Sequence, residues 1–391
     1  MMSRLSLFRE GSLMTMSMSS SPTDLRQSTA VADSLSETVL PAVGGDAPLA
    51  TPALRTAYAI VIVAPMLGLL GAIALSWGFG MQPIHLVLLI GGYILTGLGI
   101  TIGFHRLFTH KAFTTSRFMT AFWAILGSMA AEGSLFIWCG VHRVHHQFSD
   151  THADPHSPHA VSARAIALVE AQTAQLDAQR KASTIAGDAE PAAEADHHHD
   201  HHHHHDHDDH APGFRGLVYG FWHAHAGWLF RAHPADMERY IPDLRNDPVL
   251  RFVDRFFFLW LAVGLLIPGV IAGLVTQTWT GAALGVLWGG LVRILVVHHI
   301  TWSINSACHL WGARDYVSHD HSRNNLIFGI LGLGEGWHNN HHAFPTSARH
   351  GLAWWQFDLS WIIIRGMELV GLARNVRLPS PERLAAKRRS A

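Results

Sequence analysis

Four long stretches of this chain carry almost no charge, and they limit its fold more than any other feature. Each has about 20 residues, enough as a helix to cross the roughly 30 Å hydrocarbon layer of a bilayer. Charged residues make up 15% of the 391 residues and apolar residues 49%, a balance typical of membrane proteins rather than of soluble domains. We therefore predict transmembrane helices over four segments: 57–79, 84–104, 256–275 and 281–300.

Basic residues lie next to one end of each predicted helix, whereas the short linkers at the other ends are uncharged. The nearest basic residues are Arg55, Arg106, Arg255 and Arg314. Because positive charge is enriched on the cytosolic side of membranes, these ends and both termini are predicted to be cytosolic. The apolar segments 118–138 and 352–372 are predicted as helices at the cytosolic interface, since a fifth span would break the charge pattern.

Two segments of low complexity divide the chain. Residues 1–53, rich in Ser, Thr, Met and Ala, are predicted as a disordered tail. Residues 160–212 form an insertion that ends in HHHDHHHHHDHDDH. This insertion is either a metal-scavenging loop or a tolerated surface insertion with incidental metal affinity. Three parts remain. Residues 54–159 carry the first two predicted spans and histidine groups, residues 213–379 carry the last two of each, and residues 380–391 are a basic C-terminal tail.

Histidine is the other unusual component, with 31 residues against 28 lysines and arginines. Outside the insertion the histidines form groups on the predicted cytosolic side: HRLFTH at 105–110, HRVHH at 142–146, NSACH at 305–309 and HNNHH at 338–342. In HxxHH the three rings share one helix face and can converge on a metal. His105 and His110 would be splayed by roughly 140° on a regular helix. They therefore serve different metals, or the helix ends between them.

The number of clustered imidazoles predicts two metal ions, because nine ligands exceed the four to six that one ion takes. Nitrogen ligation without thiolates suits iron, zinc or copper, and spacing alone does not choose. A net charge of -1 argues against nucleic-acid binding, and two cysteines exclude a disulfide scaffold or an iron–sulfur site. A metal transporter is a further alternative, but it would need polar ligands near the middle of the membrane, where these spans have almost none.

The histidine groups, in this order, resemble those of the integral-membrane fatty acyl desaturases, in particular the stearoyl-CoA (delta-9) group. DPHSPH at 154–159, FWHAHAGWLF at 221–230 and TWSINSACHLWG at 301–312 match as well. The resemblance implies an all-α polytopic fold, with four transmembrane helices and a cytosolic helical cap that holds two irons. The implied iron ligands are His105, His110, His142, His145, His146, His309, His338, His341 and His342, with Asn305 reaching one iron through water.

The implied reaction introduces a cis double bond, at the delta-9 position, into a saturated long-chain acyl group and reduces O2 to water. The sequence has no haem motif or cysteine set, so two electrons are expected from a separate ferredoxin, flavoprotein reductase or cytochrome b5-like protein. A related membrane di-iron hydroxylase is the alternative, because the histidine groups report the metal site and not the product. Glu335 and Asp154, next to two of the groups, are expected to orient metal-bound imidazoles.

The resemblance also assigns residues to the substrate. Those matched to the acyl tunnel or the head-group region are Trp138, Thr301, Trp302, Glu132 and Arg231. Trp138 and Thr301 match the bend of the tunnel, and Arg231 matches a basic position near CoA. Animal acyl-CoA desaturases carry Arg-Asp where this chain has Gly140 and Val141. Acyl-CoA is therefore the favoured substrate, with acyl carrier protein and phospholipid acyl chains kept as alternatives.

Overall fold

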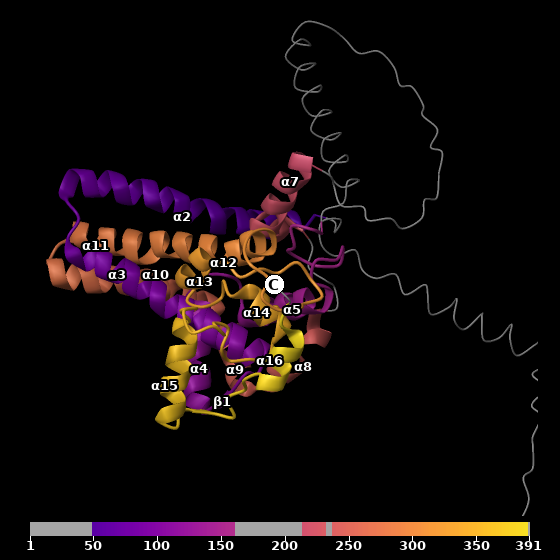
Figure 1. Ribbon diagram of the computed structural model, residues 1–391. Helices are drawn as coiled ribbons and strands as arrows, with labels where there is room; N and C mark the ends of the chain where they lie inside the picture. Colours follow the sequence, from indigo (N-terminus) through magenta and orange to yellow (C-terminus); the bar gives the residue numbers. More distant parts are fainter. Residues whose placement is uncertain (1–48, 161–212, 232–236, 390–391) are drawn as a thin grey trace, which may run out of the picture. The chain divides into compact units, whose positions relative to one another are not determined.

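The structure is a computed structural model that describes residues 49–160, 213–231 and 237–389 (Figure 1). Four of its helices are long and apolar enough to cross a membrane: Pro52–Phe79, Pro83–Thr109, Phe257–Thr276 and Trp279–Leu310. They confirm the four predicted spans and the all-α fold class. The predicted insertion and almost all of the predicted N-terminal tail lie outside the described residues.

The second and fourth long helices continue beyond the predicted spans and change their winding on the way. The second consists of α3 (Pro83–Leu98) and the π-helix η2 (Gly99–Thr109). The fourth consists of α11 (Trp279–Gly285), the π-helix η6 (Val286–Val292) and α12 (Arg293–Leu310). Both extensions carry histidines, so the membrane helices themselves contribute to the site described below.

Small residues allow the long helices to pack closely. Helix η6 packs against α2 (Pro52–Phe79), α3 and α10 (Phe257–Thr276). A Cβ on Gly289 would lie 2.5 Å from the Cβ of Pro268, closer than two carbon atoms can approach. Backbone contact through glycine is typical of helix association in membranes, where apolar side chains gain nothing by leaving lipid.

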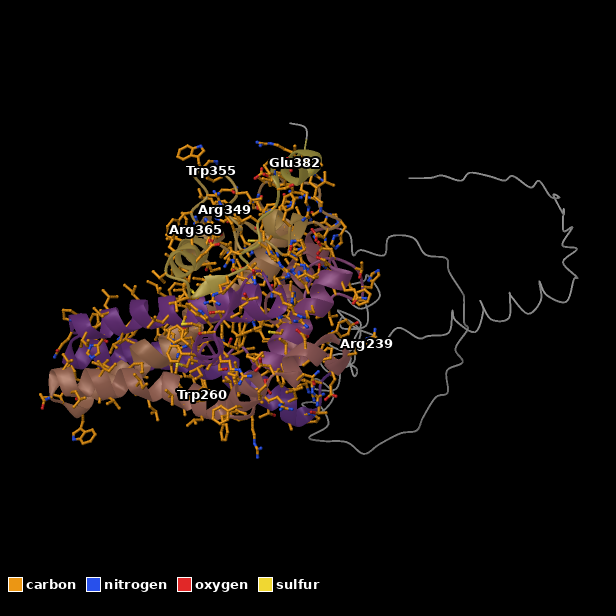
Figure 2. The ribbon with its side chains drawn as sticks, turned by 90° about the horizontal axis from the view of Figure 1, so that it is seen from below. Arg239, Trp260, Arg349, Trp355, Arg365 and Glu382 are labelled. Atoms are coloured by element: carbon orange, nitrogen blue, oxygen red, sulfur yellow. The ribbon has the colours of Figure 1, made fainter. Side chains whose placement is uncertain are left out.

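The remaining elements are short and surround the extended ends of these helices (Figure 1). The helices are α4 (Arg117–Ser128), α5 (Leu135–Phe148), α7 (Gly213–His225), η4 (Gly227–Phe230), η5 (Met237–Tyr240), α8 (Pro242–Asn246), α9 (Pro248–Arg255), α13 (Leu326–Leu331), α14 (His338–Ala343), α15 (Leu359–Leu369) and α16 (Pro381–Lys387). The strands β1 (Thr114–Thr115) and β2 (Ala373–Arg374) pair antiparallel. Figure 2 shows that Arg349, Arg365 and Glu382 belong to the C-terminal segment, outside the four long helices.

The structure corrects the predicted helix over 118–138, which is two helices separated by a break at 129–134. In the break, Ala131 and Gly133 have φ angles of 66° and 102°, and this left-handed backbone ends a helix. The second predicted interfacial helix, over 352–372, is also shorter and is limited to α15. Two side chains from α12 bind backbone carbonyls of this break.

Arg293 lies inside the fourth long helix, 1% exposed, and its guanidinium binds backbone carbonyls instead of reaching toward the membrane surface. It donates to the carbonyl oxygens of Met129 at 2.6 Å, Gly264 at 3.2 Å and Gly289 at 3.3 Å. Pro268 has no N–H to offer the carbonyl four residues before it, that of Gly264, so Arg293 supplies the missing donor.

The break at 129–134 therefore has two anchors on the fourth long helix. Arg293 binds the carbonyl of Met129, and the ring Nε2 of His298 lies 3.0 Å from the carbonyl oxygen of Ala131. These contacts fix the segment that carries Glu132 and leads into α5.

Candidate metal centre

The nine histidines of the four sequence groups lie together in the structure and form two sets. Within each set the ligand nitrogens lie within 4.8 Å of one another. The five-histidine set is His105, His110, His142, His146 and His341, and the four-histidine set is His145, His309, His338 and His342. Such clusters are compatible with a di-metal site.

Each HxxHH motif divides its rings between the two sets, which corrects the expectation that all three rings converge on one metal. In α5, His142 and His146 belong to the five-histidine set and His145 to the other. In α14 the assignment is reversed, because His338 and His342 belong to the four-histidine set and His341 to the five-histidine set. Residues four apart are offset by about 40° around a helix and residues three apart by about 60° in the opposite sense, so the i, i+4 pair stays together.

The π-helix η2 explains how His105 and His110 reach the same set. The N–H of His110 donates to the carbonyl of His105 at 3.1 Å, which is the i to i+5 hydrogen bond of a π-helix. Residues five apart then lie on one face, and the ring centroids are 4.8 Å apart. The helix does end between the two histidines, at Thr109, but the π-helical winding, which neither predicted alternative included, is what brings their rings together.

Distances between imidazole nitrogens show that the rings point inward. Nε2 of His146 lies 3.1 Å from Nε2 of His142 and 2.9 Å from Nε2 of His341. In the other set, Nε2 of His309 and of His338 are 3.0 Å apart. Two nitrogens bound to one ion at about 2.1 Å and at a right angle would be about 3.0 Å apart. The spacing therefore fits imidazoles that share a cation.

The protonation states of the histidines also favour metal binding. Burial lowers the pKa of His110, His142 and His341 well below the ordinary 6.5, so these rings are neutral and keep a lone pair for a metal. Nε2 of His145 and of His342 is buried and has no hydrogen-bond partner among the described residues. Buried nitrogens without a partner are costly unless a ligand binds them.

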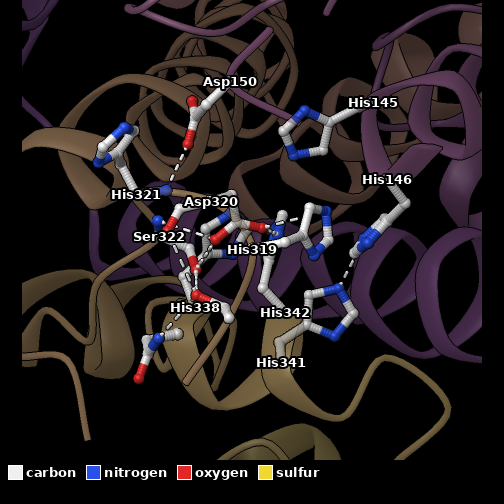
Figure 3. Close-up of polar contacts among 12 residues, drawn as sticks. His145, His146, Asp150, His319, Asp320, His321, Ser322, His338, His341 and His342 are labelled. Atoms are coloured by element: carbon white, nitrogen blue, oxygen red, sulfur yellow. Dashed lines mark hydrogen bonds and ion pairs between the residues drawn. The ribbon is translucent and has the colours of Figure 1, made fainter. Parts of the chain in front are cut away.

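Carboxylates hold the outer nitrogens of four of these rings. Asp154 lies 2.8 Å from Nδ1 of His145, and Asp150 lies 2.9 Å from Nδ1 of His309. Asp320 lies 2.5 Å from Nδ1 of His342; Figure 3 shows both residues among the clustered rings. Glu335 lies 2.5 Å from Nδ1 of His105. A carboxylate at Nδ1 fixes the tautomer that presents Nε2 to a metal and makes the ring more basic.

Both sets border one apolar cavity of about 430 Å³. His105 and His142 line it from the five-histidine set, and His338 lines it from the other. Its apolar wall includes residues from the first turns of α2 and of α10, such as Leu54 and Phe257. The cavity thus joins the membrane helices to the histidines.

Three polar side chains meet in the wall of this cavity. Trp138 Nε1 donates to Oε2 of Glu132 at 3.0 Å, and the ring of Trp138 stacks on His142 with centroids 5.0 Å apart. Burial raises the pKa of Glu132 to about 7, although hydrogen bonds from Thr301 and Trp138 oppose the rise. The neutral form of this carboxyl, which predominates below about pH 7, suits an apolar ligand.

The comparisons with known proteins agree with this geometry. The family model "Fatty acid desaturase" matches residues 187–371. The hex-5-enoyl-[acyl-carrier protein] acetylenase of Moorena producens is 36% identical over 326 residues, 83% of this chain and 87% of that protein. The chain belongs to the fatty acid desaturase family. The sn-1 stearoyl-lipid 9-desaturase of Anabaena variabilis is 35% identical over 73% of this chain and 81% of that protein. The enzyme of the same name from Synechocystis is 31% identical over 86% of this chain and 85% of that protein.

The desaturase places most of the predicted substrate residues at the cavity. Trp138, Thr301, Trp302 and Glu132 line it, as does Asn305. Arg231 is not among the lining residues; it follows η4, whose Trp228 and Leu229 do line the cavity. Of the two predicted orienting carboxylates, Glu335 contacts His105 and Asp154 contacts His145.

Sequence reasoning missed three buried groups next to the desaturase histidines. Asp150 follows His146 by four residues, and Asp320 stands between two histidines in SHDHS, so an acid close to histidines was an available signal. His350 had none. Its ring is fully buried, with its centroid 4.5 Å from that of His341 and its Nδ1 3.6 Å from Glu335.

Proposed function

We propose that this desaturase uses its nine histidines to hold two irons and introduces a cis double bond, at the delta-9 position, into a saturated long-chain acyl group. The observation that carries the proposal is the pair of inward-facing imidazole sets at the wall of one apolar cavity. When bound, the irons would use O2 and two electrons to remove hydrogen from an unactivated CH2–CH2 pair. The all-nitrogen donor sets suit iron.

The side chains around the cavity would position the acyl chain and exclude water from it. An acyl chain consists of nearly identical CH2 groups, so a selective reaction needs one pair to be held next to the metal ions. Trp138 is well placed for this task, because its ring stacks on His142 while its N–H is held by Glu132. Asn305, one helical turn before His309, faces the same cavity, where it would hold water near the four-histidine set.

We further propose that the acyl chain is carried by a membrane glycerolipid. The wall of the cavity includes residues of two candidate membrane helices, Tyr58 on α2 and Phe258 on α10. Arg231, on which the expectation of CoA rested, is not a lining residue. Two of the relatives, at 35% and 31% identity, are named as stearoyl-lipid desaturases and one, at 36%, as acting on an acyl-carrier protein, whereas two at 32% and 30% are named as acyl-CoA desaturases. Acyl-CoA and acyl carrier protein are the carriers against which the lipid must be tested.

The proposal also includes a membrane orientation and a partner. With the basic ends of the four helices in the cytosol, the histidines and both termini are cytosolic. Electrons would then reach the irons from a separate soluble or membrane-attached donor such as a ferredoxin, a flavoprotein reductase or a cytochrome b5-like protein.

Product analysis with purified protein tests this function. Iron-loaded protein in liposomes, with reduced ferredoxin as donor, is given stearoyl groups on a glycerolipid, on CoA or on acyl carrier protein. We expect a delta-9 monounsaturated product from the glycerolipid, none from His142→Ala, and about two irons per chain. A hydroxylated product would instead identify a hydroxylase. Metal uptake by the liposomes without lipid change would identify a transporter, and faster turnover of acyl-CoA would reverse the choice of carrier.

A further inference from the structure

The two histidine sets differ in the charge that surrounds them. In the four-histidine set, three rings have an aspartate on Nδ1: His145 with Asp154, His309 with Asp150 and His342 with Asp320. Among the described residues, the five-histidine set has one such contact, between His105 and Glu335.

Each of the three aspartates is held in place by further donors. Asp150 accepts the backbone N–H of His321 at 2.7 Å, which Figure 3 shows, and Asp320 accepts the N–H of Ser322 at 3.1 Å. Asp154 accepts the N–H groups of Asp150 at 2.9 Å and His156 at 3.1 Å. Backbone donors stabilise the ionised form of a carboxylate and fix its direction. The four-histidine set is therefore enclosed by three oriented negative charges.

The one carboxylate of the five-histidine set has a cation beside it. Arg106 Nη1 donates to Oε1 of Glu335 at 2.7 Å, and the guanidinium is fully buried. Arg106 Nη2 also donates to Asp358 at 3.2 Å. Arg106 is shared between the two carboxylates and offsets part of the charge of Glu335. Among the described residues, the three aspartates of the other set have ion pairs with histidines but with no lysine or arginine.

We propose that the four-histidine set binds its metal ion more tightly than the five-histidine set and is the first of the two to be filled. The inference rests on the proposed two-metal function and adds an order of loading to it. A divalent cation is attracted by the three aspartates, and the three rings that they orient present Nε2 without first choosing a tautomer. A protein made under metal shortage would then carry one ion, bound by His145, His309, His338 and His342.

One feature of the five-histidine set acts in the opposite direction, since it offers one more imidazole. Each set also contains one ring whose Nδ1 is buried and has no partner among the described residues, His341 in the five-histidine set and His338 in the other, so this feature favours neither set. Binding measurements compare the two contributions directly.

Cobalt(II) titration of the metal-free full-length protein in detergent tests the order without any turnover. A chromophoric chelator competes for the metal and resolves the binding steps. We expect two steps for the native protein besides any binding by the 197–210 histidine tract. Asp150→Asn and Asp320→Asn should each weaken the tighter step about 10–100-fold and leave the weaker step unchanged, whereas Glu335→Gln should weaken only the weaker step. Every variant keeps the 197–210 histidine tract, so its contribution cancels in the comparison.

Glu368→Gln is the matched control, because Glu368 pairs with Arg365 on α15, away from both histidine sets, and should change neither step. Monodisperse elution of each variant excludes misfolding, and two separate aspartates are tested in case one variant fails to fold. Two equal steps, or a tighter step weakened by Glu335→Gln, would overturn the order of loading. If none of the three variants changes any step, the carboxylates do not set the affinities and the order of loading is also overturned. If His142→Ala and His338→Ala change no step either, the sets do not hold metal, and the proposed function fails instead.

Discussion

Helices α5 and α14 carry the same HxxHH spacing but differ in length and in what holds them. Helix α5 has 14 residues and α14 has six. The i, i+4 pair of α5 belongs to the five-histidine set and that of α14 to the four-histidine set. The spacing therefore determines which two rings stay together, and the placement of each helix determines which metal position they face.

The two residues inside each motif show how the helices are placed. In α5 they are Arg143, which binds Asp243 and the carbonyl of Phe108, and the buried Val144. In α14 they are Asn339 and Asn340, both buried. A long helix can rely on apolar packing, whereas a helix of six residues needs directed hydrogen bonds to be fixed. The comparison teaches that the residues between the histidines position the ligands as much as the ligand spacing does.

Removing the i, i+4 pair from each helix should give the largest effect and tests the division of the rings. We expect His142→Ala with His146→Ala, and His338→Ala with His342→Ala, each to lower bound iron from about two to about one per chain and to abolish desaturation. Metal analysis and product analysis measure the two outcomes. Loss of both irons from either double variant would mean that the sets do not bind independently.

Asn340→Ala should destabilise the protein more than Val144→Ala. Asn340 Nδ2 donates to the carbonyl of His350 and to Gln356, both at 2.8 Å, and its Oδ1 accepts from Asn324 at 2.7 Å. Leaving these buried partners unpaired should cost about 3 kcal/mol, against about 2 kcal/mol for two lost methyl groups at Val144. Thermal unfolding in detergent compares them, and a larger loss for Val144→Ala would contradict the stated difference in anchoring.

Glu132, just before α5, should make substrate affinity depend on pH. Burial raises the pKa of this carboxyl to about 7, so it is neutral below that pH and becomes charged above it. An acyl chain is bound less well next to a charge, and KM should therefore rise several-fold between pH 6.5 and 8.5. Glu132→Gln should give a flat KM over this range. An unchanged profile in the variant would show that another group titrates.

The smallest effect is expected from deleting residues 162–210, because none of the histidine groups or motifs that resemble those of the desaturases lies there in the sequence. Desaturation at ample iron should stay within about twofold of the intact chain. A defect that appears only at low iron would support metal scavenging by the tract. A deletion protein that is folded but inactive at ample iron would show that the segment has a catalytic or structural role.

The spans and the grouping of nine histidines could be predicted because both depend on local composition and spacing. The set to which each histidine ring belongs could not be predicted from the sequence. It depends on the π-helical winding of η2, which brings His105 and His110 to one face, and on the position of α14, which Asn339 and Asn340 fix through distant partners. The break at 129–134 was also missed, since the apolar run conceals a left-handed backbone at Ala131.

Arg293 has a consequence for the timing of synthesis. Its partner carbonyl at Met129 lies 164 positions earlier in the chain, and His298 holds Ala131 across 167 positions. A ribosome that adds roughly 5–20 residues per second needs on the order of 10–30 s to cover this distance. During that interval the segment leading into α5 has been made, but its anchors have not. The nascent desaturase must therefore hold three of its nine histidines without these anchors until its last membrane helix is in place.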